Sequence, residues 1–300
     1  MHDRDTLHRF LFERYPIRGH LVHMDAAWRA LIEHRHYPDT IRETLGEAVV
    51  ASLLLAATIK FEGVLSLQLQ GDGPVHLLLA QCTSGLGVRG LARYRDLNIP
   101  DDFKIRDLIG AGNLTVTLET DDGAQRYQGI VPIEGGRLAD SLQAYFQNSE
   151  QLPTRLWLHA DAQGASGMLL QKLPGTSSVT AGDAAAIEDA WRRVQLIGDT
   201  LTPEELRTLE DAEILHRLFN EDDLRLFEPS PVFFRCRCSR ERVAGMLQGL
   251  GEAETRSVIA ERGKVEVQCD FCDRAYTFDA VDVAQLFKSA LATDRGSSVH

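Results

Sequence analysis

Four of the five cysteines in this 300-residue chain lie within its last quarter, in two close pairs. Cys236 and Cys238 form a C-x-C pair, and Cys269 and Cys272 form a C-x-x-C pair after 30 intervening residues. Five cysteines are too few for a disulfide scaffold of this length, and an odd number cannot pair fully. Clustered thiols of this kind more often bind metal or do redox work. The pattern therefore predicts a compact C-terminal segment built around the two pairs.

The spacing of the pairs suits one zinc ion per chain. Zinc takes four soft ligands in a tetrahedron, and no histidine lies between positions 236 and 272, so an all-cysteine site is the simplest assignment. Thiolates exclude magnesium and calcium. Iron–sulfur ligation is the metal alternative, and buried thiols without a ligand are the structural one. A thioredoxin-like role for the C-x-x-C pair is disfavoured because no βαβ unit surrounds it.

A closed site of four thiolates leaves no position for substrate, so we expect no metal catalysis and no catalytic residues. Arginines at 235, 237, 240 and 242 flank the first pair. They either favour the reactive thiolate form or belong to a solvated, salt-bridged face. Oxidation of any pair would eject the metal. Structural zinc contributes about 10–16 kcal/mol in small peptides, more than the net stability of a domain, so its loss should unfold the segment. The chemistry predicts a redox switch without saying what is switched.

The remaining candidates for chemistry are weaker. Cys82 follows an apolar strand and is expected to be a small buried hydrophobe. His20 with His23, and His34 with His36, could form metal pairs, but no partner ligands stand out nearby, so solvated or core-edge positions are favoured. We find no nucleophile elbow, P-loop or dinucleotide fingerprint. The chain is therefore not expected to be an enzyme.

Hydrophobic periodicity predicts an α+β fold for the first 175 residues. Helices are expected at 24–35, 41–59 and 137–147, the second opened by a capping box from Thr40 to Glu43. Period-two alternation predicts strands. They are expected at 65–70, 75–80, 114–118, 125–131, 155–160 and 168–172. Strands that follow one another through turns favour a largely antiparallel sheet.

A Pro/Gly/Ser-rich boundary at 173–178 divides this core domain, residues 1–178, from an acidic linker, residues 179–232. Positions 183–228 carry 13 acidic and five basic residues, and helices are expected at 184–197 and 203–219. Thr202, Pro203 and Glu205 form a strong helix start. The apolar stripes of these helices need a covering surface. The linker is either an ordinary helical subdomain packed on the sheet or a metastable segment.

Residues 233–300 form the predicted zinc-binding domain. Ser239 should cap a helix that runs to about 249, and a second helix is expected at 252–262. Alternating apolar residues lead into Cys269 and continue after Cys272. This C-x-x-C pair should therefore lie at the tip of a hairpin.

Charge and hydropathy limit the partners. The net charge of −12 and a pI near 5.3 repel phosphate backbones, so nucleic-acid binding is not expected. The N-terminus lacks the apolar core of a signal peptide. The most apolar stretch, 48–59, is shorter than the 20 or so residues of a membrane-spanning helix. We expect a cytoplasmic protein without membrane contacts.

The two cysteine pairs, placed after an acidic helical stretch, resemble those of the redox-regulated heat-shock chaperones called 33 kDa chaperonins. The resemblance extends over nearly the whole chain, in order. It includes Gly90–Ala92, Gly112–Thr117, Tyr127–Val131, Tyr145–Thr154 and Gly167–Pro174. The Ala165–Met168 turn departs from the family in having fewer glycines and leucines.

The resemblance implies an ATP-independent holdase that is zinc-bound and inactive when reduced. It implies that peroxide or hypochlorite, together with unfolding stress, joins Cys236 to Cys238 and Cys269 to Cys272 and releases zinc. The linker then loosens, unfolded client proteins bind, and homodimers form. Two other classes remain open: a zinc-ribbon interaction module and a thiol–disulfide oxidoreductase.

Overall fold

The computed structural model describes residues 4–95, 99–100, 103–123, 126–174 and 181–294. The chain divides into two compact units, Met1–Arg235 and Cys236–His300, which we call the core unit and the cysteine unit. The predicted α+β class is confirmed: the core unit combines two six-stranded sheets with helices, and the cysteine unit combines a hairpin with helices. Within the described ranges, no helix has the length and apolar character that a membrane crossing requires.

The first sheet of the core unit joins the N-terminus to the acidic linker. Its main path runs β10 (Leu224–Leu226), β1 (Thr6–Phe12), β2 (Ile17–Met24), β9 (Ala165–Lys172) and β8 (Thr154–Ala160), and β11 (Ser230–Pro231) also pairs with β1. All its pairings are antiparallel. The predicted helix at 24–35 is wrong at its start, because Met24 ends β2 and helix α1 spans Ala26–Ile32. Strands β10 and β11 of the linker therefore extend the first sheet by pairing with β1 of the core domain.

The second sheet contains the predicted hairpins. Its order is β12 (Phe233–Phe234), β5 (Gly87–Tyr94), β4 (Val75–Thr83), β3 (Gly63–Gly71), β6 (Gly112–Thr120) and β7 (Arg126–Pro132). Strands β3 and β4, and strands β6 and β7, pair as the alternation predicts. Strand β12 pairs in parallel with β5, so the chain returns to this sheet just before the cysteine unit begins.

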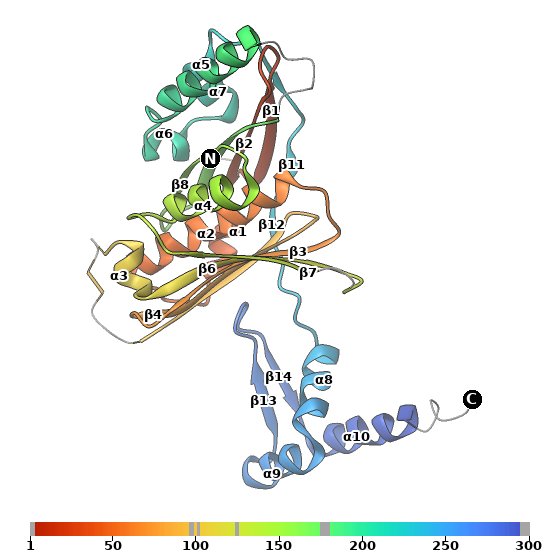
Figure 1. Cartoon of the computed structure of the whole chain (residues 1–300). Helices are drawn as coiled ribbons and strands as arrows, with labels where there is room; N and C mark the ends of the chain where they lie inside the picture. The colour runs from red at the N-terminus through yellow and green to blue at the C-terminus, as the bar shows by residue number, and fades with distance from the viewer. Residues whose placement is uncertain (1–3, 96–98, 101–102, 124–125, 175–180, 295–300) are drawn as a thin grey trace. The chain divides into compact units, whose positions relative to one another are not determined.

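Helix α2 (Asp39–Thr58) packs against both sheets, which explains why its sequence is apolar on nearly every side (Figure 1). Glycines let the backbones approach closely. A Cβ atom on Gly46 would lie 2.3 Å from that of Ala160, and one on Gly167 would lie 2.5 Å from a Val50 methyl carbon. The predicted Thr40 capping box is wrong: the helix begins at Asp39 after Pro38, and the Thr40 hydroxyl donates to the Pro100 carbonyl at 3.2 Å.

Shorter helices complete the core domain around these layers. They are α3 (Ile105–Ile109), α4 (Leu138–Tyr145) and the π-helix η1 (Phe146–Glu150). Leu138, Leu142 and Phe146 add buried side chains to the same hydrophobic core that surrounds α2. The predicted helix at 137–147 therefore ends in a π-helical turn rather than as one continuous α-helix.

Three linker helices cover the outer face of the first sheet: α5 (Ala181–Gly198), α6 (Pro203–Thr208) and α7 (Asp211–Phe219) (Figure 1). They form a second hydrophobic core with strands β1, β2 and β9. The Thr202 capping box is confirmed, with the Glu205 amide donating to the Thr202 hydroxyl at 3.2 Å. The boundary expected at 173–178 lies largely outside the described residues.

The predicted helix at 203–219 is divided into α6 and α7. Leu209 has an extended backbone and ends α6. The Arg4 guanidinium donates to the carbonyl oxygens of Arg207 and Leu209, at 2.8 Å for Leu209, so a distant cation satisfies the carbonyls that the break exposes. The apolar stripes of the linker helices are buried against the first sheet in this structure, and whether the linker is also metastable stays a prediction.

The cysteine unit has its own small core. It contains α8 (Arg240–Leu250), α9 (Glu252–Arg262), the hairpin of β13 (Val265–Gln268) and β14 (Ala275–Phe278), and α10 (Ala280–Asp294). Among the described residues, six hydrophobic side chains form its buried cluster. They are Leu247, Val265, Tyr276, Phe278, Val283 and Phe287.

Candidate metal centre

Two local motifs present the four cysteines. Cys269 follows β13, and the turn closes with a 3.0 Å bond from the Cys269 amide to the Arg274 carbonyl. Asp273 supports that turn with a left-handed backbone. On the other segment, Ser239 caps α8 by accepting from the Arg242 amide at 3.2 Å, as predicted, and so fixes the chain that carries Cys238. The hairpin-tip prediction for the C-x-x-C pair is confirmed.

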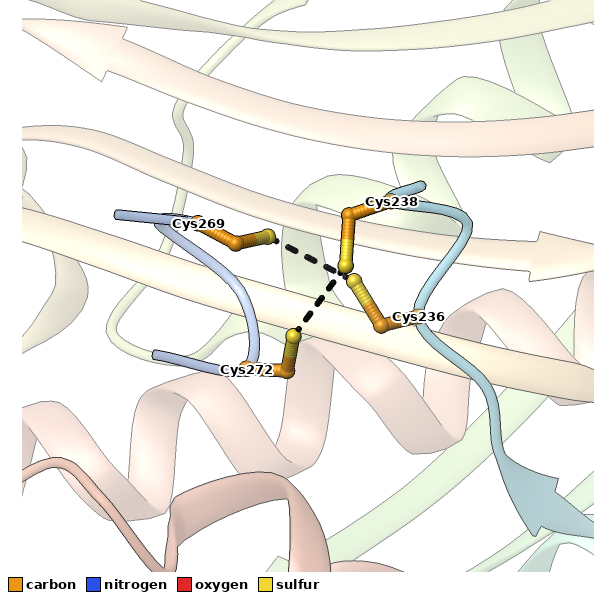
Figure 2. Close-up of side chains that lie close together, drawn as sticks. All are labelled: Cys236, Cys238, Cys269 and Cys272. Carbon is orange, nitrogen blue, oxygen red and sulfur yellow. Dashed lines mark hydrogen bonds between the residues drawn. The ribbon is translucent and has the colours of Figure 1, made fainter. Parts of the chain in front are cut away.

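The four sulfur atoms converge (Figure 2). All lie within 4.8 Å of one another, and the closest contacts cross between the segments, at 3.5 Å for Cys236–Cys269 and 3.4 Å for Cys238–Cys272. A tetrahedron with sulfur about 2.3 Å from its centre has edges of about 3.8 Å. The cluster therefore has the size, the ligand number and the soft donor atoms to hold a metal ion, and it is compatible with zinc. In the described ranges, no other group of histidine, cysteine or acidic side chains has this arrangement.

The thiols differ in how readily they ionise. Burial opposes ionisation of Cys238, but hydrogen bonds from Tyr276 and from the neighbouring thiols outweigh it and lower the pKa of Cys238 to about 7. Burial raises the pKa of Cys236 and of Cys272, and competing thiols add to the shift. The hydrogen bonds around Cys238 therefore favour its thiolate, which is the form of cysteine that binds a metal cation.

Two residues outside the cysteine pattern, Tyr276 and Arg274, also contact this cluster. The Tyr276 hydroxyl donates to Cys238 Sγ at 3.1 Å, and the Arg274 side chain interacts with Tyr276 and acts on the charges of Cys238 and Cys272. Tyr276 is one of the alternating apolar residues that follow Cys272, and that alternation predicts its place on the second strand of the hairpin. Its contact with Cys238, 38 residues away, depends on tertiary structure.

Two of the flanking arginines serve structural contacts. Arg240 lies 4.2 Å from the centre of the Phe278 ring, donates to the Thr277 carbonyl at 2.7 Å and pairs with Asp282 at 2.8 Å. Arg242 donates to the Arg237 carbonyl at 2.8 Å. The Arg240 contacts join α8 to β14 and α10, and the Arg242 contact joins α8 to the C-x-C segment, so both arginines contribute to the packing of the unit.

The other candidates lie in the core unit. Cys82 is fully buried, as expected, and burial raises its pKa to about 12. His34 and His36 are exposed. His20 and His23 are buried rather than solvated, and His23 contacts the carboxylate of Asp211 instead of a metal group. The structure therefore brings together the four predicted cysteines and none of the histidine pairs.

Known proteins match this chain over almost its whole length. The Hsp33 protein family matches residues 5–279. A protein of Methylobacillus flagellatus named 33 kDa chaperonin is 46% identical over 96% of both chains, and one of that name from Nitrosococcus oceani is 46% identical over the full length of both.

A solved structure supports the fold independently. The crystal structure of the 33 kDa chaperonin from Thermotoga maritima superposes with a TM-score of 0.81 at 22% identity, covering 96% of this chain and 99% of that one. This structure supports the fold alone, whereas the match to the family over residues 5–279 and the 46% identity to the two chaperonins establish the relationship. The chain belongs to the Hsp33 family.

Proposed function

We propose that the chain is a redox-regulated, ATP-independent holdase chaperone, inactive when reduced and zinc-bound. The observation that carries this proposal is the convergence of four cysteine sulfurs, from two segments, within 4.8 Å in a unit with a small core. Membership of a family whose relatives are named chaperonins supports the chaperone role. The four ligands are Cys236, Cys238, Cys269 and Cys272, and one zinc ion per chain satisfies them.

The cysteine unit depends on its metal for stability. A unit of this size rarely gains more than about 3–5 kcal/mol from its core alone. Bound zinc would link the α8 segment to the hairpin through its four ligands. The free energy of zinc binding exceeds the contribution of the small hydrophobic core. Removing the metal should therefore unfold the unit, which makes the thiols a sensor whose output is loss of structure.

The linker helices conceal an apolar surface that an unfolded client could use. In the docked state they cover a face of the first sheet whose buried residues include Phe10, Phe12, Ile17, Leu21, Met168 and Leu170. Undocking would expose that face and the apolar stripes of the helices together. Regulation by docking follows, because the same surface cannot be covered and bind a client at once.

The activating reaction balances as a two-electron oxidation. Two thiolates lose one electron each to form one S–S bond, and one peroxide takes up those electrons and two protons to give two waters. Cys236 joins Cys238 and Cys269 joins Cys272, so full oxidation consumes two peroxides and frees one zinc ion. This pairing rests on the family resemblance.

The proposal assigns a role to each segment. Residues 1–178 form the chaperone core, 179–232 the acidic linker that undocks, and 233–300 the zinc switch. The protein works in a reducing cytoplasm, binds unfolding proteins without nucleotide, and forms a homodimer when oxidised.

One experiment tests the proposal. Zinc content and suppression of client aggregation are measured on the same full-length sample before and after peroxide treatment at mild heat-shock temperature. We expect about one zinc per reduced chain, its release on oxidation and the appearance of aggregation suppression. Iron, absence of metal after anaerobic purification, or equal activity before and after oxidation would contradict the proposal. Catalytic turnover in insulin reduction would indicate an oxidoreductase instead.

A further inference from the structure

A largely apolar pocket of about 230 Å³ lies in the core unit, lined by residues of both sheets. Its apolar walls come from α2, β3 and β6 and from the chain that follows α4. They include Leu55, Leu65, Val116, Leu118, Phe146 and Leu152. Two further lining residues, Ile59 and Tyr127, are 43% and 50% exposed, so the pocket has a rim that reaches solvent. The pocket can therefore take a short apolar group from outside.

One wall of this pocket carries a cation, Arg18 of β2. Its Nε and Nη2 groups donate to Gln171 Oε1 at 3.0 and 2.6 Å. Gln171 is fully buried, and its own amide nitrogen donates to Thr154 Oγ1 at 2.9 Å. A fixed and neutral partner therefore holds the guanidinium in place without cancelling its charge.

The charge of Arg18 has no anion beside it. In the part of the chain that the structure describes, no carboxylate pairs with Arg18, and its two bonds to Gln171 leave further N–H groups able to donate. Burial lowers the pKa of Arg18, and its charge adds to the burial that lowers the pKa of His20. A carboxylate would complement this site, because a guanidinium can bind both carboxylate oxygens through parallel hydrogen bonds.

A second polar group of the pocket, Glu150 of η1, sets the direction in which an anion would bind. The hydroxyls of Tyr127 and Tyr145 donate to Glu150 Oε1 at 2.8 and 2.6 Å, so this carboxylate is already satisfied by its own partners. An entering anion is attracted by Arg18 and repelled by Glu150. The charged end of a ligand should therefore meet Arg18.

We propose that this pocket binds a small apolar carboxylate, with the anion on Arg18 and the hydrocarbon part against the walls formed by α2, β3 and β6. The residues that line the pocket extend from Arg18 to Gln171, so the inference goes beyond the proposed function and requires neither zinc nor oxidation. A free fatty acid and the C-terminal residue of an apolar peptide both offer this chemistry.

Octanoate is the first probe, titrated by calorimetry into the reduced full-length protein. Octan-1-ol and octylamine serve as ligands of the same chain length without the carboxylate. We expect octanoate to bind at one site, about ten- to a hundredfold more tightly than octan-1-ol, because charged hydrogen bonds to Arg18 distinguish the two. Octylamine should not bind. Equal affinities for octanoate and octan-1-ol would overturn the inference.

Arg18→Met tests the cation directly, because it keeps an unbranched side chain and removes the charge. Octanoate should then bind as weakly as octan-1-ol. Arg225→Met is the matched control: Arg225 is an exposed arginine of the same sheet that pairs with Glu13, and its loss should leave octanoate binding unchanged. Octanoate binding that is the same in Arg18→Met as in the wild type contradicts the proposal.

A measurement on the wild type covers the case in which Arg18→Met fails to fold. An octanoate analogue with a diazirine at the end of its chain is irradiated with the protein, and the labelled peptides are mapped. Labels should fall on the peptides that contain Leu65, Val116 or Leu152. Labels confined to the linker helices or to the cysteine unit would refute the site.

The two sources of the carboxylate are separated with N-acetyl-leucyl-leucine and its C-terminal amide. Binding of octanoate alone assigns the pocket to free acids, and binding of the peptide acid but not of its amide assigns it to chain termini; either result supports the inference. Binding of neither acid overturns it. Zinc content is measured on the same sample, so a zinc-free protein that binds octanoate would contradict the proposed function alone.

Discussion

Asp211 at the start of α7 lies 2.8 Å from Nδ1 of His23 on β2, and both side chains are almost fully buried. Burial opposes ionisation of Asp211, but contacts with His23 and His8 outweigh it and hold the pKa of that carboxyl below its usual range. The other ring nitrogen of His23 bonds the Leu206 carbonyl at 2.7 Å. The buried His23 side chain therefore links strand β2 of the first sheet to both α6 and α7 of the acidic linker.

Replacing Asp211 by Asn should release the linker. The substitution keeps the shape but removes the charge that His8 and His23 face, and breaking a buried pair typically costs about 3–5 kcal/mol. We expect hydrogen exchange over residues 183–228 to lose protection while β3 and β6 keep theirs. Aggregation suppression should appear in the reduced, zinc-bound protein.

Asp189→Asn is the matched control for this change. Asp189 is exposed on α5 and pairs with Arg192 one turn away. Such surface pairs contribute little, so protection and activity should stay at wild-type levels. An Asp211→Asn linker that exchanges no faster than this control would show that the buried pair does not hold the linker.

Gly198 provides a second test of docking. A Cβ atom there would lie 2.5 Å from the Trp157 ring, and the Trp157 indole donates to Asp199 at 3.1 Å. Gly198→Ala should therefore force α5 away from β8, at a cost of about 1–3 kcal/mol, and raise holdase activity before oxidation. Gly245→Ala in α8 has open space for its Cβ and should leave that activity unchanged. Equal activities of the two variants would contradict the prediction.

Charges placed on the linker stripe should have a larger effect. Leu215 is buried in the second hydrophobic core and Leu209 packs against it, so replacing both by Glu puts carboxylates into an apolar contact. We expect an unprotected linker and holdase activity in the reduced, zinc-bound state. Leu196→Glu, at an exposed α5 position, is the control. A double variant with an unprotected linker but no activity would show that unfolding of the linker does not control holdase activity.

The parts of the fold that sequence could predict depend on local pattern. The hairpins of the second sheet, the Thr202 and Ser239 caps and the four converging cysteines all follow from periodicity or spacing over a few residues. By contrast, β10 to β12 are too short to show a period and exist because β1 and β5 pair with them.

Contacts between distant residues explain the other errors. The break between α6 and α7 is supported by Arg4, about two hundred positions earlier, and no local signal predicts that partner. The Tyr276–Cys238 bond is similar, because the hairpin and the C-x-C segment meet only after folding. The convergence of the four cysteines was therefore predictable from their spacing, whereas the side chain that contacts Cys238 from the hairpin was not.

Cys82 should take no part in the switch. It is fully buried, its thiol donates to the Thr83 carbonyl at 3.3 Å, and burial raises its pKa to about 12. Peptide mapping after peroxide treatment should find Cys236 joined to Cys238, Cys269 joined to Cys272, and Cys82 free. Cys82→Ser should bind zinc and become active like the wild type. A dominant Cys238–Cys269 link would refute the neighbour pairing without affecting the zinc assignment.

His20 should make the core unit sensitive to acid. It is 2% exposed, and burial together with Arg18 and Arg9 lowers its pKa from 6.5 to about 3, although the Ala57 backbone opposes the shift. The unfolded chain takes up a proton below pH 6.5 and the folded chain does not until near pH 3. Stability from this group is therefore present above pH 6.5 and is lost as the pH falls toward 3.

The sign and size of that loss can be measured against a variant that does not titrate. At pH 4.5 the neutral, buried His20 should lower the free energy of unfolding by roughly 3 kcal/mol relative to its value at pH 7. Full-length wild type and His20→Gln are unfolded by denaturant from pH 7 to 4.5, with the core transition followed by hydrogen exchange of β2 and β9. As the pH falls, the free energy of unfolding of the wild type should decrease by that amount relative to that of His20→Gln. Parallel pH curves would show that His20 is as easily protonated in the folded chain as in the unfolded one.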